Sequence, residues 1–548
     1  MTVPALQKVL SDNRRIMGRA LCSFFVLALT VALGSCAGNS DSAPPPKANY
    51  GYTLLLRGFD PNGKPMALAG ILLADNHGSI LGGELDLNDA GQITHVPSPV
   101  TGSYTTSSSF GGILRGETSI TTNFKLPGTN IPLGLKFVFN NGATQGRIIE
   151  FDNSGFSNSG IVYIQEPTAI EEANPVGNFA FGLDSDAPMG ARTVAAGEFE
   201  IVNQLQRAPN GGIAGGLVDQ SNTCAPAPTY CTSPIAAGLA TGPDAFGRGT
   251  LTLNAGGTPA QFAFYVVNAG EMFLMEIDSG AKPGTLLAGV ARQQATFNMN
   301  SPNTTAVLQM TGLDTVQGGN ALAPDVIIGA MSIIPGGSFT LTFDTNDAGS
   351  VQTGQQVAGS VLSFDPSSGR GVISIAGGFS SGFMDTAIFY LYSSGEGFLI
   401  DADPASGGGA VNKGLSGNFI LQSAGPFSNE TLGGQSLVGS GGSSTAAIPN
   451  AEGAAVFDSN DGTFSAIGDL TSILKGDGNV TNGSFNGTFQ VSDPVMGHGT
   501  AMVSAELFGN FTQGLLYPAT FYIVAPNQFV LIGTQRGSSS GVTYFDPQ

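Results

Sequence analysis

The segment "GRGTLTLNAGGTPAQFAFYVVNAGEMFLMEID" (residues 247–278) contains three short apolar runs separated by turns rich in Gly and Asn. Within "FAFYVV" and "FLMEID" no helical period of 3.6 residues survives, and both runs have the length and composition of β-strands. The runs follow each other too closely for a crossover helix between them. Successive strands are therefore expected to pair antiparallel, as a meander.

The same pattern recurs along the chain. It is clear in "GRGVISIAGGF" (369–379) with "TAIFYLYSSGEGFLIDAD" (386–403), and in "GHGTAMVSAEL" (497–507) with "ATFYIVAPNQFVLIGTQ" (519–535). A weaker copy is "LKFVFNNGATQGRIIEFD" (135–152). The period is roughly 110–135 residues, which is the size of a domain, and each copy holds about eight apolar runs. The sequence thus predicts four copies of one unit.

These units predict an all-β protein of four tandem antiparallel meander domains, each with about eight strands. An up-and-down barrel is favoured, because closure removes exposed strand edges from a chain with 80 Gly and only 11% charged residues. A two-sheet sandwich is the alternative. The expected boundaries are 1–35 for an export signal with its helix, 36–49 for a tether, and 50–168, 177–295, 304–414 and 416–548 for the four β repeats.

The N-terminus has the features of an export signal. Four basic residues, Lys8, Arg14, Arg15 and Arg19, precede an apolar run at 20–33. This run is short for a membrane-spanning helix, which needs about 20 residues, and it suits the apolar part of a signal peptide. The following "LGSC" (33–36) resembles the lipobox of bacterial lipoproteins. An ordinary secreted protein with an incidental Cys36 is the alternative.

The lipobox resemblance implies that Cys36 receives a diacylglycerol and becomes the first residue of the mature chain. Ala37 follows it, and not the Asp that marks inner-membrane retention in that family, so the resemblance favours the outer membrane, facing the periplasm or the cell surface. Several buried acyl chains hold a protein stably on a membrane. The repeats also resemble the tandem all-β repeats of lipoproteins from environmental bacteria, a resemblance that implies an architecture and no activity.

The net charge and the cysteines limit the classes of partner and site that this chain can have. The net charge of −20 leaves no basic surface for nucleic acid. Cys224 and Cys231 bracket "APAPTY", and such a close pair in an exported protein predicts a local disulfide. A metal site would need further ligands, and no His lies near these cysteines. No cofactor and no metal is expected.

Three turns are rich in Asp and Asn: "DLNDAG" (86–91), "DTNDAG" (344–349) and "DSNDG" (458–462). Their oxygens are of the kind that bind Ca²⁺, but the bidentate Glu and the flanking helices of an EF-hand are missing. Asp and Asn also form Asx-turns and tolerate positive φ, as hairpins require. Turn formation is the favoured interpretation, with calcium binding as the alternative.

Comparison of the copies suggests ion pairs inside each unit. Arg248 and Glu276 in the second unit correspond to Arg370 and Asp401 in the third, and the fourth has His498 and no acid. The strands concerned start at the same end of a meander, which predicts Arg248–Glu276 and Arg370–Asp401 pairs that neutralise partly buried carboxylates. The first unit differs: Gly112 takes the Arg place, so Glu150 would need Arg115 or Arg147.

Catalysis has little support. The chain has only His77, His95 and His498, and no nucleophile elbow of the G-x-S-x-G type stands between a strand and a helix. We expect a non-catalytic cell-envelope lipoprotein whose repeats act as a spacer and interaction surface for an envelope protein or a glycan. The alternative is lipocalin-like binding of small apolar ligands inside the barrels, and a membrane-spanning barrel or an enzyme are further alternatives.

Overall fold

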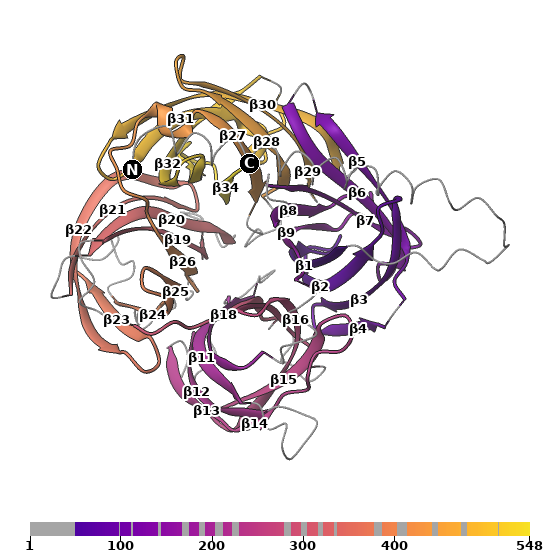
Figure 1. Cartoon of the computed structure of the whole chain (residues 1–548). Coiled ribbons are helices and arrows are strands. Elements are labelled where there is room, and N and C mark those ends of the chain that lie inside the picture. Colours follow the sequence, from indigo (N-terminus) through magenta and orange to yellow (C-terminus); the bar gives the residue numbers. More distant parts are fainter. Residues whose placement is uncertain are drawn as a thin grey trace, which may run out of the picture. The chain divides into compact units, whose positions relative to one another are not determined.

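The structure is a computed structural model, and Figure 1 shows the chain coloured from indigo at the N-terminus to yellow at the C-terminus. It describes residues 50–97, 99–110, 113–140, 144–166, 175–185, 192–202, 212–221, 230–278, 286–297, 304–315, 322–333, 337–376, 386–402, 414–440, 448–472, 479–512 and 514–548. Among these residues, no helix is both long enough and apolar enough to cross a membrane.

The expected all-β fold of four tandem eight-stranded barrels is confirmed. In the first barrel β3 also pairs with β2, which closes the sheet, and β4 and β5 together take the place of one strand beside β3. Its strands are β1 (Tyr50–Phe59), β2 (Pro65–Ala74), β3 (Ser79–Asp89), β4 (Gln92–Val96), β5 (Gly102–Phe110), β6 (Ile113–Lys125), β7 (Pro132–Phe139), β8 (Gln145–Glu150) and β9 (Ser157–Ile164).

The second barrel closes in the same way, through β11 and β12, and has β13 and β14 beside β12. Its strands are β10 (Gly177–Asp184), β11 (Val194–Val202), β12 (Gly212–Gln220), β13 (Cys231–Ala236), β14 (Gly238–Leu239), β15 (Arg248–Ala255), β16 (Thr258–Asn268), β17 (Glu271–Glu276) and β18 (Ala288–Gln293).

The third and fourth barrels are uninterrupted meanders. The third consists of β19 (Thr304–Thr315), β20 (Leu322–Ile333), β21 (Ser338–Asp347), β22 (Ser350–Asp365), β23 (Arg370–Ile375), β24 (Thr386–Ser393), β25 (Glu396–Asp401) and β26 (Ser416–Leu421). The fourth consists of β27 (Gly434–Ser440), β28 (Asn450–Asp458), β29 (Thr463–Thr471), β30 (Asn479–Asp493), β31 (His498–Ser504), β32 (Leu516–Ala525), β33 (Gln528–Gly533) and β34 (Val542–Pro547). The 3₁₀ turns η1 (Asn429–Leu432) and η3 (Ala505–Phe508) also belong to the described part of the fourth barrel.

One expected boundary is wrong. The segment at 416–421, assigned from the sequence to the fourth repeat, is β26, which pairs with both β25 and β19 and completes the third barrel. The "GNF" in this segment also occurs at the start of β10, the first strand of the second barrel. The same short pattern can therefore stand in the first or in the last strand of a meander. The fourth barrel begins at Gly434.

Strands with apolar residues on both faces explain why the barrels pack against one another. Along β16, Phe262, Phe264 and Val266 belong to the cluster that fills the second barrel. The alternate residues Ala263, Tyr265 and Val267 belong to a different cluster, formed with the first barrel. Side chains alternate between the two faces of a strand, so a continuous apolar run predicts a strand that is buried on both sides.

Close contact between the first and last strands closes three of the barrels. A glycine occupies the same place on β9, β18 and β26, namely Gly160, Gly289 and Gly417. A Cβ there would lie 1.9, 2.0 and 1.8 Å from the nearest carbonyl oxygen, in Leu55, Gly182 and Gln309 respectively. Because no Cβ approaches a backbone oxygen so closely, these positions require glycine.

If β4 with β5, and β13 with β14, are each counted as one strand, every barrel has eight strands in order. The first and second strands of each barrel then pack against the sixth and seventh strands of the next. Apolar clusters join β1 and β2 to β16 and β17, β10 and β11 to β24 and β25, and β19 and β20 to β32 and β33. The fourth barrel meets the first through the corresponding strands, because β27 and β28 contact β7 and β8. The four interfaces therefore form a closed cycle of contacts within residues 48–548.

Hydrogen bonds and ion pairs mark the interface that closes this cycle. The Ser159 hydroxyl donates to Asn450 at 2.7 Å, and the Asn450 amide donates to Ser157 at 3.0 Å. Lys136 pairs with Asp469 at 2.9 Å. In the described part of the chain, the apolar clusters between barrels belong to the three interfaces that are continuous in sequence.

Candidate functional site

Residues that lie directly opposite one another on neighbouring strands form a row that runs around each barrel. One such row is equivalent in all four barrels, and we refer to it as the row. On the third strand, the row holds a fully buried aspartate in all four copies: Asp86, Asp219, Asp344 and Asp469. On the fifth strand it holds Glu117, Arg248, Arg370 and His498, and on the sixth Val138, Tyr265, Tyr390 and Tyr522. The row thus contains Arg248, Arg370 and His498, which the sequence singled out, but neither Glu276 nor Asp401.

The row aspartate of one barrel binds the row arginine of the next barrel. Arg370 Nε donates to Asp219 Oδ2 at 2.7 Å, and Nη2 donates to Oδ1 at 3.0 Å. The Tyr390 hydroxyl donates to the same Oδ2 at 2.6 Å. Such bidentate, charge-assisted hydrogen bonds are among the strongest polar contacts in proteins.

The same contact recurs at the neighbouring interfaces. Arg248 binds Asp86 at 2.6 and 3.0 Å, with the Tyr265 hydroxyl donating at 2.8 Å. At the third interface His498 Nε2 lies 2.9 Å from Asp344 Oδ2, and its ring centroid lies 4.9 Å from that of Tyr522. These groups join barrels.

The predicted partners are therefore wrong. Arg248 and Arg370 lie opposite Tyr265 and Tyr390 and project outward from their barrels with them. Glu276 lies three residues after the outward-facing Phe273 on its strand, and Asp401 lies three residues after the outward-facing Phe398. An odd separation places a side chain on the opposite face of the sheet. Glu276 accepts a hydrogen bond from the Leu287 N–H at 3.0 Å, and burial raises its pKa to about 7.

The first barrel also differs from the prediction. The register places Glu117, not Gly112, at the arginine position, and Gly112 itself lies outside the described residues. Glu150 accepts hydrogen bonds from Ser154 at 2.9 Å and from Asn158, and burial raises its pKa well above the usual range. Arg147 pairs with Asp546 of the fourth barrel at 2.6 Å.

A glutamine after the last strand makes a second repeated contact, which the sequence analysis missed. Its amide donates to two backbone carbonyls of the next barrel, at distances of 2.5–3.0 Å. The residues are Gln165 (to Phe246 and Val266), Gln294 (to Ser368 and Leu391) and Gln422 (to Met496 and Ile523). Each stands five residues after the closing-strand glycine, and this G-x₄-Q spacing was the available signal.

The Asp-rich turns also serve the interfaces. Asn88 and Asn346 accept hydrogen bonds from the N–H of Gly91 and Gly349 at 2.8 and 2.9 Å, as expected of Asx-turns. Their amide groups donate to carbonyls of the next barrel, in Glu276 at 2.9 Å and in Gly533 at 2.8 Å. The third turn is capped by Asp458, which accepts from the Asn460 N–H at 3.0 Å. These contacts support the turn interpretation.

A carboxylate cluster lies where the cycle closes. Oxygen atoms of Glu117, Glu452 and Asp469 lie within 4.8 Å of one another, and all three residues are buried. The Lys136 ammonium lies 2.9 Å from Asp469 and 3.3 Å from Glu117, so a protein cation already occupies this acidic site. Lys136 thus plays the part that Arg248 and Arg370 play at other interfaces.

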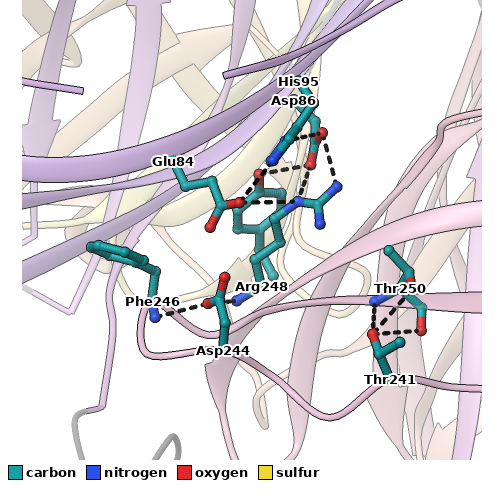
Figure 2. Close-up of polar contacts among 9 residues, drawn as sticks. Glu84, Asp86, His95, Thr241, Asp244, Phe246, Arg248 and Thr250 are labelled. Atoms are coloured by element: carbon teal, nitrogen blue, oxygen red, sulfur yellow. Dashed lines mark hydrogen bonds and ion pairs between the residues drawn. The ribbon is translucent and has the colours of Figure 1, made fainter. Parts of the chain in front are cut away.

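The interface between the first and second barrels holds a further polar cluster (Figure 2). His95 lies 3.1 Å from Glu84 and 2.9 Å from Asp86, and Arg248 faces both carboxylates. Burial, followed by a hydrogen bond with Asp244, raises the pKa of Glu84 to about 8. Near neutral pH, Glu84 is therefore largely protonated.

The cluster predicts a pH-dependent stability. Glutamate in an unfolded chain titrates near pH 4.3, so between about pH 4.5 and pH 8 the folded protein binds more protons at Glu84 and loses stability as pH rises. We expect Glu84→Gln to raise the melting temperature at pH 8.5 and to leave it nearly unchanged at pH 5. Equal slopes of melting temperature against pH in the variant and the wild type would contradict this, and Glu430→Gln, at an exposed position, is the control.

Two predicted residues, Cys36 and Cys224, lie outside the described residues, so lipidation and the disulfide stay predictions. Cys231 is the first residue of β13. No protein-family model matches this sequence, and no curated protein matches it.

Proposed function

We propose that this chain is a non-catalytic lipoprotein of the cell envelope, anchored through Cys36, in which four barrels form one rigid scaffold for interaction with other envelope components. The observation that carries the proposal is the recurrence of one polar contact at three interfaces: a row aspartate of one barrel against a row cation of the next. A group repeated at equivalent places to join domains is architectural.

The packing of the barrel interiors supports a scaffold over a lipocalin-like carrier. Each barrel is filled by its own cluster of buried hydrophobic side chains. The fourth, for example, stacks Phe529 on Phe545 with ring centroids 4.1 Å apart, and Phe457 contacts both rings. A carrier of apolar ligands would need an apolar cavity of about 300 Å³ or more inside the barrel.

Labelling with a radioactive fatty acid tests the anchor. The wild-type chain is expected to carry the label and to fractionate with the outer membrane, whereas Cys36→Ser is expected to carry none and to remain an uncleaved precursor. Cys22→Ser, within the predicted signal, is the matched control and should behave as the wild type. Label on the Cys36→Ser protein would refute lipidation at this residue.

Protease treatment of intact cells tests which side of the outer membrane the barrels face. Digestion of the barrels would support display on the cell surface. Complete protection, with digestion only after the outer membrane is permeabilised, would exclude surface display and support a periplasmic role. Fractionation of the chain with the cytoplasm would overturn the envelope proposal.

A further inference from the structure

A cavity of about 370 Å³ lies between the barrels and outside their interiors. Residues from all four barrels line it, mostly from the first and last strands, which pair with each other in every barrel. The closed cycle of interfaces creates this cavity, so it exists only when the four barrels are assembled. Its size is within the usual range of small-molecule sites.

Charges on the cavity wall are balanced. Three arginines and three carboxylates line it: Arg57, Arg147, Arg292, Asp184, Glu396 and Asp546. Each guanidinium is already paired: Arg57 with Asp184, Arg147 with Asp546, and Arg292 with Glu271. A charged ligand would have to compete with these pairs, so the wall favours an uncharged one.

Neutral polar side chains also line the cavity. Gln309 on β19 donates to Asn418 on β26, and the Tyr544 ring of β34 lies 4.3 Å from the Arg147 guanidinium. Gln309 is 6% exposed, and its Oε1 accepts no hydrogen bond within the described part of the chain. A buried amide oxygen without a donor lowers stability. Gln309 lines the cavity, and a rotation of its side chain that turned this oxygen toward the cavity would let a bound hydroxyl group donate to it.

We propose that this cavity binds a small, uncharged, polyhydroxylated molecule of the mono- or disaccharide class, held by Gln309, Asn418 and Tyr544. Amide groups offer donors and acceptors in one plane, which suits hydroxyls that do both. One face of the Tyr544 ring carries the Arg147 guanidinium, and the other face is the one that would pack against the ring carbons of a sugar. This binding goes beyond the scaffold role and does not depend on lipid at Cys36.

The barrel repeats themselves supply matched variants. The position equivalent to Gln309 is occupied by Leu55 in the first barrel. The position equivalent to Asn418 is occupied by Val290 in the second barrel. Gln309→Leu and Asn418→Val therefore introduce residues that this backbone position already accepts elsewhere. Gln355→Leu, at an exposed site on β22, is the control.

Thermal unfolding of the full chain with added sugars tests the inference. The probes are glucose, galactose, N-acetylglucosamine, maltose and cellobiose, with glucuronate, glucosamine and hexanoate as charged and apolar comparisons. At least one neutral sugar is expected to raise the melting temperature in a concentration-dependent way, since a ligand that binds only the folded state stabilises it. In Gln309→Leu and Asn418→Val the affinity should fall about tenfold or more, with Gln355→Leu unchanged.

Three results would overturn the inference. One is the absence of a shift with every neutral sugar. Another is a shift produced only by glucuronate, glucosamine or hexanoate, which would assign the cavity to a different chemical class. The third is a shift of equal size in the Gln309→Leu and Asn418→Val proteins, which would place sugar binding elsewhere. Each result is independent of the outcome of the labelling experiment on Cys36.

Discussion

Asp219→Ala is expected to lower the free energy of unfolding by about 3–5 kcal/mol, the usual effect of removing one partner of a buried ion pair. Asp219 is fully buried and binds Arg370 twice and the Tyr390 hydroxyl once. Burial raises the pKa of Tyr390, so its hydroxyl is a donor and never a counter-charge. Without the carboxylate, the guanidinium would keep, among the described residues, only a 3.4 Å contact with the Thr232 hydroxyl, and the phenol would lose its acceptor.

Urea unfolding of the full chain, followed by circular dichroism, measures this loss. The exposed turn variant Asp458→Ala is the control and should lose about 1 kcal/mol or less. Asp219→Leu combined with Arg370→Leu is expected to be less destabilised than either single variant, because it removes both charges. A loss for Asp219→Ala no larger than that of the control would show that the pair does not hold the second and third barrels together.

Gln422→Ala is expected to cost about 2–4 kcal/mol, because two carbonyls in the fourth barrel lose their donor at a site that excludes water. The amide donates to Met496 at 2.9 Å and to Ile523 at 2.5 Å, and the residue is 7% exposed. Its position between β26 and β27 makes it a link between the third and fourth barrels. Urea unfolding again gives the magnitude.

Limited proteolysis adds a local measurement for the same variant. If Gln422 fastens the two barrels, cleavage between residues 422 and 434 should become faster in Gln422→Ala than in the wild type. Gln355→Ala on the exposed face of β22 is the control and should change neither measurement. Unchanged cleavage and unchanged stability in Gln422→Ala would show that this contact is incidental.

Much of the fold could be predicted because its signals are local. Short apolar runs such as "FAFYVV" and "FLMEID" identified strands, and turn residues such as those at 344–349 identified hairpins. Repetition then implied four similar domains. The boundary at 414–416 failed because the end of one meander and the start of the next share the same short apolar pattern, and only pairing with β19 distinguishes them.

The candidate site was predicted only in part. Arg248 and Arg370 do form ion pairs, but not with Glu276 and Asp401. Each of these acids lies an odd number of residues from an outward-facing residue of its strand, so it faces the other side of the sheet, and this spacing could have been counted in the sequence. The true partners, Asp86 and Asp219, lie 162 and 151 residues away in the chain. No local pattern relates residues at such a separation.

The sequence by itself determined the strands and the fourfold repetition, because strand periodicity and turn chemistry act over a few residues. Only the tertiary structure decided which barrel faces which, that the fourth barrel meets the first, and that a charge-balanced cavity lies between all four. The physical reason is that outward-facing apolar rows can be buried only against another barrel. The pairing of buried charges follows from that contact and from nothing nearer in the chain.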